Sequence, residues 1–63
     1  MATVSEIVRK IKRKTNCYIL RHGAEHDIWI NPDNGIEFTI PRHPSRELAS
    51  GTAKSILRAA GLL

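Results

Sequence analysis

The sequence predicts an α+β domain with the element order α-β-β-β-α, in which two helices cover one face of a three-stranded antiparallel sheet. Three observations support this fold class. Apolar residues recur with helical spacing near both ends of the chain. Between these two segments, apolar and polar residues alternate as they do in strands. The segment Asn-Pro-Asp-Asn-Gly has the composition of a tight turn, so we expect it to join two strands as a β-hairpin.

Length and composition narrow the class of protein. A chain of 63 residues has room for one domain, which we expect to span residues 1–63. With 41% hydrophobic and 25% charged residues, the chain has the composition of a folded globular domain rather than a disordered tail. Cys17 is the only cysteine, so an intrachain disulfide is impossible and a reducing, cytoplasmic setting is favoured. No apolar run approaches the roughly 20 residues that cross a bilayer, so we expect no membrane-spanning segment.

The first predicted helix begins after Thr3, because Thr3 and Glu6 have the spacing of a capping box. Its apolar residues follow the i, i+3, i+4, i+7 rule and form one stripe, which consists of Val4, Ile7, Val8 and Ile11. We expect the helix to end at Thr15 and Asn16.

Three strands are expected over residues 17–20, 26–31 and 36–40, with a polar loop at residues 21–25. In the second strand Ile28 and Ile30 share one face, and Asp27 and Trp29 alternate with them. In the third strand the residues of the apolar face are Ile36, Phe38 and Ile40.

Pro41 and Pro44 interrupt regular structure, so residues 41–47 are expected to form a loop. Ser50 is the expected N-cap of the second helix, and Gly61 is its expected stop. The apolar stripe of this helix consists of Ala53, Ile56, Leu57 and Ala60. The two helices and the sheet should share one core, which contains Ile7, Ile11, Phe38, Ile56 and Leu57.

The charge of the chain is unevenly distributed. Ten Lys and Arg residues against six Asp and Glu residues give a formal net charge of +4. Half of the basic residues lie within six positions of the first helix, at Arg9, Lys10, Lys12, Arg13 and Lys14. Such a cluster attracts phosphates and predicts a surface that binds nucleic acid. The alternative is a solvated helix face whose charge complements the dipole of its own helix.

Few residues could carry out chemistry. The three histidines lack the spacing of a metal site, and the chain has no nucleotide-binding motif, so we expect neither a metal nor another cofactor. Cys17 is expected to be a small buried hydrophobic residue rather than a nucleophile.

His26 is the strongest catalytic candidate, because it stands where a glycine-containing loop enters a strand and because histidine transfers protons near neutral pH. The alternative for His26 is a solvent-facing or capping residue. His43 is the candidate for a second polar group at the same edge, and its alternative is an ordinary loop residue. Trp29 and Tyr18 are expected to pack in the core rather than to stack on unpaired bases.

Four segments occur in the order and at the spacing of a known family: GAEHDIW at residues 23–29, NP at 31–32, IPRH at 40–43 and GTAKSILRAAG at 51–61. With the first helix, the chain resembles the HicA-type toxins over residues 7–63. These toxins are small ribonucleases of toxin–antitoxin pairs. The resemblance implies a fold like that of a double-stranded-RNA-binding domain and metal-independent cleavage of mRNA. It also implies that His26 is the catalytic histidine and that a HicB-type antitoxin covers its edge of the domain.

The sequence therefore leaves three functions to compare. The first is an endoribonuclease in which His26 moves a proton, His43 is the candidate second group, and Arg42 or the basic helix stabilises the phosphate. The second is a noncatalytic RNA-binding module, and the third is a purely protein-binding domain. Glu25 and Asp27 flank His26 in the sequence and would repel phosphate there, which disfavours the binding module.

Overall fold

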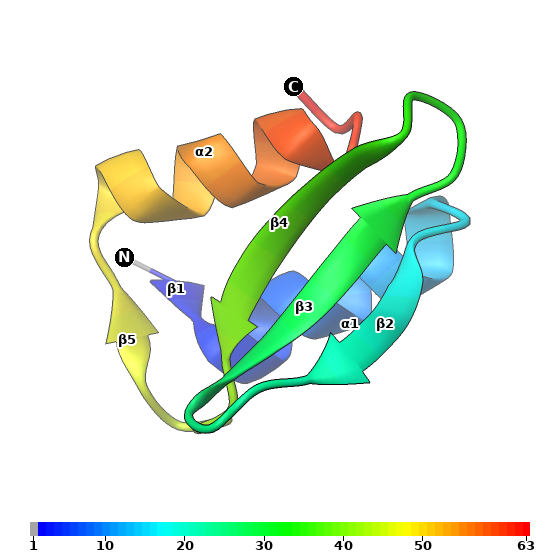
Figure 1. Ribbon diagram of the computed structural model, residues 1–63. Coiled ribbons are helices and arrows are strands. Elements are labelled where there is room, and N and C mark those ends of the chain that lie inside the picture. The colour runs from blue at the N-terminus through cyan, green and yellow to red at the C-terminus, as the bar shows by residue number, and fades with distance from the viewer. Residues whose placement is uncertain (1) are drawn as a thin grey trace.

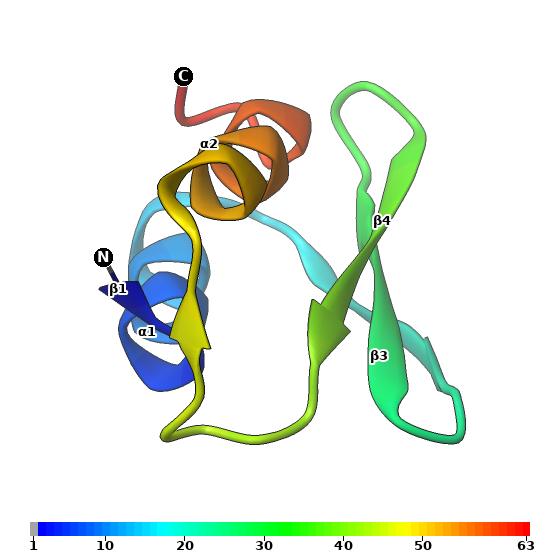
Figure 2. The same ribbon diagram turned by 90° about the vertical axis from the view of Figure 1, so that its left-hand side faces the viewer.

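The computed structural model describes residues 2–63 and has the predicted α+β architecture (Figure 1). Its main elements are α1 (Val4–Lys14), β2 (Tyr18–His22), β3 (His26–Asn31), β4 (Ile36–Pro41) and α2 (Ser50–Ala59). The three strands form an antiparallel sheet in the order β2-β3-β4. Figure 2 shows both helices on the same side of the sheet. The predicted order α-β-β-β-α is thus confirmed.

Two further strands were not predicted from the sequence. β1 (Ala2–Thr3) and β5 (Glu47–Leu48) pair as a short antiparallel ribbon beside the helices. The predicted limits of the loop at residues 41–47 are therefore wrong at both ends, because Pro41 is the last residue of β4 and Glu47 is the first residue of β5. Pro41 is tolerated since β4 is an edge strand, where a missing N–H breaks no ladder. Strands of two residues are too short to produce an alternating pattern.

The predicted limits of α1 are confirmed by its capping bonds. The backbone N–H of Glu6 donates to Thr3 Oγ1 at 3.3 Å, and the backbone N–H of Thr3 donates to Glu6 Oε1 at 3.1 Å. This pair is the capping box that the sequence predicted. At the other end, Thr15 is the C-cap and its N–H donates to the carbonyl of Ile11 at 2.9 Å.

The two ends of α2 differ in how well they were predicted. Ser50 is not the N-cap, because the helix begins at Ser50 and the cap position is held by Ala49, whose side chain has no capping bond to offer. Gly61 does end the helix as predicted, with a φ of +87° that other residues rarely adopt. Behind it the N–H of Leu62 donates to the carbonyl of Leu57 at 2.8 Å.

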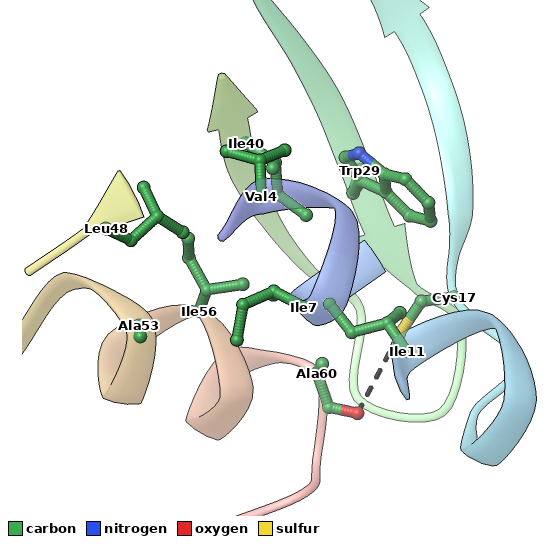
Figure 3. Close-up of a cluster of buried hydrophobic side chains, with 10 residues drawn as sticks. All are labelled: Val4, Ile7, Ile11, Cys17, Trp29, Ile40, Leu48, Ala53, Ile56 and Ala60. Carbon is green, nitrogen blue, oxygen red and sulfur yellow. Dashed lines mark hydrogen bonds between the residues drawn. The ribbon is translucent and has the colours of Figure 1, made fainter. Parts of the chain in front are cut away.

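The core lies between the helices and the sheet (Figure 3). Its buried hydrophobic residues are Val4, Ile7, Ile11, Cys17, Trp29, Ile40, Leu48, Ala53, Ile56 and Ala60. The expectation that Cys17 is buried is confirmed. Among the residues 2–63, no helix is long and apolar enough to cross a membrane.

The expectation that Trp29 packs in the core is confirmed, whereas Phe38 and Leu57 are less buried than predicted. Trp29 is only 2% exposed, whereas Phe38 and Leu57 are half-buried at the margin of the core. Phe38 lies opposite Trp29 on β4, and their rings stack with centroids 6.4 Å apart. Tyr18 was also expected in the core, but it is 51% exposed. The larger ring of Trp29 takes the central place because β3 is the middle strand of the sheet.

This arrangement predicts unequal costs for the two large aromatic residues of the sheet. Trp29→Ala should lower the free energy of unfolding by about 3–5 kcal/mol, which is a large fraction of the stability of a small domain. Phe38→Ala should cost less, because part of its ring is already in water. Urea unfolding of both variants measures the difference, and a larger cost for Phe38→Ala would contradict this description of the core.

Candidate functional site

His26 is exposed at the first position of β3, directly after the loop that closes the β2–β3 hairpin. The loop is tight: the N–H of Gly23 donates to the carbonyl of His26 at 2.8 Å. A Cβ on residue 23 would lie 2.7 Å from the same carbonyl oxygen, closer than real Cβ atoms come. Glycine at position 23 is therefore required for the backbone that positions His26.

The side chain of His26 belongs to the open face of the sheet, the face that the helices leave uncovered. Side chains alternate along a strand, and Trp29 and Asn31 of β3 are buried toward the helices. His26 and Ile28 therefore point the other way. They line a shallow depression with residues of the hairpin loop and Thr39 of β4.

Asp27 points toward the helix side and holds the same end of the sheet together. His22 Nδ1 donates to Asp27 Oδ1 at 2.6 Å, and Arg42 Nε donates to the same oxygen at 3.0 Å. Arg42 Nη2 also donates to the carbonyl of Gly23. We call these three side chains, His22, Asp27 and Arg42, the Asp27 cluster. The cluster ties the ends of β2, β3 and β4 to the hairpin loop that carries His26.

The Asp27 carboxyl group is adapted to this role. The hydrogen bond from His22 and then the Arg42 guanidinium hold the pKa of Asp27 below its ordinary value of 3.8, although removal from water acts in the opposite direction. The carboxylate is thus charged and paired, with its side chain only 14% exposed.

The expectation that Asp27 stands beside His26 as a repelling charge is wrong. The two residues are neighbours in the sequence, but their side chains leave β3 on opposite faces. Glu25 is exposed in the loop, where its carbonyl accepts from the N–H of Arg42 at 3.2 Å.

The place of His22 was not predicted from the sequence, because a β-bulge changes the register of β2. Tyr18 and Ile19 pair with Ile30 and Trp29, but the next paired residue is Arg21 rather than Leu20. The extra residue brings His22 opposite Asp27, where it completes the cluster. An uninterrupted strand would have placed Arg21 there.

The predicted basic surface is divided by the fold. Arg9 and Lys12 border a groove of about 380 Å³ between α1 and the sheet, which Asp27 and Arg42 also line. Its walls are largely apolar and include Val8, Ile19, Trp29 and Ile40. The remaining basic residues of the helix are exposed outside this groove: Lys10, Arg13 and Lys14.

The fold brings together some of the predicted site residues and separates others. Arg42 lies against the loop of His26, as its bonds to Gly23 and Glu25 show. His43 follows it as an exposed residue of the loop to β5. Helix α1, which carries the basic residues, lies on one side of the sheet (Figure 2). The alternation of side chains along β3 places His26 on the other, open face. Within residues 2–63, no three His, Cys, Asp or Glu side chains are grouped so that they could hold a metal ion.

Comparison with known proteins gives a match to a family model. A family model described as the HicA toxin of bacterial toxin–antitoxin systems matches residues 4–62. The match covers both helices, the three-stranded sheet and the Asp27 cluster. No curated protein matches the chain at a significant level.

The low pKa of Asp27 makes the hairpin end sensitive to acid. The folded-state pKa lies below the unfolded one, so the cluster stabilises the fold above about pH 4, and this contribution is lost as the pH falls through the folded-state pKa. An NMR titration of the Asp27 carboxyl carbon should give a midpoint below 3.8. His22→Ala should raise that midpoint, and so should Arg42→Gln. Arg58→Gln, which removes a distant charge on α2, should leave it unchanged, and a wild-type midpoint at or above 3.8 would contradict the cluster.

Proposed function

The chain belongs to the HicA toxin family, and on that basis we propose that it is a metal-independent endoribonuclease that cleaves mRNA with His26 as its catalytic residue. It is the toxin of a toxin–antitoxin pair. The observation that carries the proposal is the placement of His26. An exposed imidazole stands on a backbone fixed by Gly23 and by the Asp27 cluster, so it can meet a substrate without a change in the fold.

The reaction that suits a lone histidine uses the nucleophile already present in RNA. The 2′-OH attacks the adjacent phosphorus while a base takes its proton. The O2′–P bond forms, the P–O5′ bond breaks, and the departing O5′ takes up a proton from an acid. The products carry a 2′,3′-cyclic phosphate and a 5′-hydroxyl. His26 serves as the base or the acid in this reaction, a contribution typically of about 10²–10⁴-fold.

The other requirements of the reaction fall to neighbouring residues. His43 is the candidate for the second proton-transfer group, because it is exposed and follows directly on Arg42, which binds the His26 loop. Arg42 donates from Nε to Asp27 and from Nη2 to the carbonyl of Gly23, and its side chain remains 43% exposed. A guanidinium has five N–H donors, so Arg42 can hold the loop and still donate to a phosphate in the transition state.

The partners follow from the same proposal. The substrate is mRNA in the cytoplasm, and the basic residues of α1 attract its backbone: Arg9, Lys10, Lys12, Arg13 and Lys14. The toxin's partner is a HicB-type antitoxin, which would cover the His26 edge. A noncatalytic RNA-binding module remains the alternative, since the exposed basic face of α1 would serve it equally well.

Replacing His26 separates these two functions. His26→Ala should preserve the fold, because the side chain is exposed and outside the core. RNA cleavage should fall by at least about 100-fold and growth inhibition should disappear, while RNA binding persists. Wild-type cleavage should survive EDTA and should fail on RNA with 2′-O-methyl groups. Full cleavage by His26→Ala protein, purified free of other nucleases, would exclude this mechanism, and binding without any wild-type cleavage would favour the module.

The basic face of α1 is tested by its salt dependence. Replacing Lys10 and Arg13 with Gln should weaken RNA binding irrespective of sequence and flatten the plot of log K against log salt by about 0.7 per lost contact on single strands. Replacing Lys54 and Arg58 of α2 with Gln removes the same charge from another helix and is the matched control. Equal salt slopes in the two double variants would assign the α1 cluster to a solvated face.

A further inference from the structure

The open face of the sheet carries a row of side chains that neither the core nor the catalytic proposal uses. The pairing of β2, β3 and β4 places on this face, with His26, the residues Tyr18, Arg21, Ile28, Ile30, Glu37 and Thr39. Both helices and the β1–β5 ribbon lie on the other side of the sheet (Figure 2). The row is therefore open to a partner along its whole length.

Tyr18 is the most exposed aromatic residue of the sheet. It is 51% exposed and lies directly opposite Ile30, so its ring stands beside the half-buried Ile28 and Ile30 on the open face. An exposed aromatic ring on a sheet can stack on an unpaired base, because every base has a π-face. Tyr18 is not part of the hydrophobic core, so core packing does not explain why an aromatic residue stands at this position.

The β-bulge of β2 also determines where Arg21 points. In an uninterrupted strand Leu20 would pair with Ile28, and Arg21 would pair with Asp27 and face the helices. Because the pairing skips Leu20, Arg21 pairs with Ile28 and joins the open face. There its guanidinium Nη2 lies 3.6 Å from Glu37 Oε1, and the two side chains are 60% and 49% exposed. A pair so exposed to water contributes little, so a phosphate can replace Glu37 as the partner of Arg21.

These residues connect two surfaces that the fold separates. Along β3, the five residues from His26 to Ile30 span about 13 Å, with Arg21 beside the middle and Tyr18 beside the far end. Beyond Tyr18, a link of three residues leads back to the last turn of α1, which contains Arg13 and Lys14. A strand of RNA that follows this row passes from the catalytic histidine to the basic helix around the edge strand β2.

We propose that single-stranded RNA binds along the open face of the sheet beside β2, with Tyr18 stacked on a base and Arg21 bound to a phosphate. The proposal rests on the ribonuclease function proposed above and adds that the RNA bound is single-stranded. A duplex does not fit this role, because its bases are already stacked and paired and cannot turn toward Tyr18.

The binding test uses the full chain carrying His26→Ala, so that RNA is not cut during the measurement. Fluorescence anisotropy with a labelled single-stranded RNA gives the affinity, and a hairpin duplex of the same length is the comparison. Tyr18→Ala should weaken single-strand binding about tenfold or more, and Tyr18→Phe, which keeps the ring, should restore it. Arg21→Gln should flatten the salt slope by about 0.7. Glu37→Gln should tighten binding, since it removes the competitor for Arg21.

Matched controls come from residues of similar exposure outside the row. Ile36→Ala changes a 48% exposed residue of the same sheet whose position opposite Asn31 places it on the helix side. Arg58→Gln removes an equal charge from α2. Neither should change binding to the single strand beyond the small effect of net charge.

The outcomes separate this proposal from the function on which it rests. Unchanged single-strand binding in Tyr18→Ala and Arg21→Gln would overturn the RNA path, and His26-dependent cleavage would still stand. Equal loss of duplex and single-strand binding would also overturn it. Loss of antitoxin binding with RNA binding intact would assign the open face to a protein partner instead. Absence of cleavage in the wild-type chain with the predicted Tyr18 and Arg21 effects intact would reject the nuclease and keep the RNA path.

Discussion

The burial of Trp29 determines the orientation of every other side chain on β3. A strand turns alternate residues to opposite faces, so placing one large ring in the core assigns both faces at once. With Trp29 beneath the helices, Asn31 and Asp27 also face the helices, and His26, Ile28 and Ile30 face outward. A slip of one residue would bury His26 and expose Trp29. The hydrophobic core therefore fixes the exposure of the proposed catalytic residue, although the two do not touch.

The Asp27 cluster and the bonds of the hairpin loop hold the backbone of His26 in place. A strand end with a loop is usually among the more mobile parts of a small fold, because few buried contacts hold it. Here the loop is held from both sides: the N–H of Gly23 binds the carbonyl of His26, and the carbonyl of Gly23 accepts from Arg42. Arg42 is in turn held by Asp27, which also binds His22. The charged side chains of Asp27 and Arg42, on the helix side of the sheet, thus hold the loop next to His26, whose side chain lies on the open face.

Local signals were enough to predict the helices and most of the strands, whereas the site depends on information that the sequence does not display locally. Thr3 and Glu6 mark the start of α1 because a capping box involves only neighbouring residues, and Gly61 marks the end of α2 for the same reason. β3, in contrast, has apolar residues on both faces, so alternation alone could not decide whether Trp29 or the isoleucines were buried.

The bulge at Leu20 is the clearest example of a feature hidden from the sequence, since nothing in Tyr-Ile-Leu-Arg-His shows where pairing skips a residue. Because the pairing skips Leu20, Arg21 lies opposite Ile28 and His22 lies opposite Asp27. The hypothesis that His26 is catalytic came from its glycine-containing loop, which is a local signal, and from the resemblance to a family, which rests on motifs spread over most of the chain. The ribbon of β1 and β5 was not predicted, because pairing between two short segments far apart in the sequence leaves no pattern in four residues.

The small size of the domain explains why its chemistry lies on the outside. A chain of 63 residues buries only about 60% of the surface that its unfolded form exposes, so it cannot enclose a polar active site without losing much of its core. The fold has one buried layer, in which Trp29 packs with residues of the two helices, and the other face of the sheet is not covered. The proposed site uses that bare face, where an exposed histidine carries no share of the stability. Substitutions that change substrate contacts on this face are therefore separable from substitutions that unfold the protein.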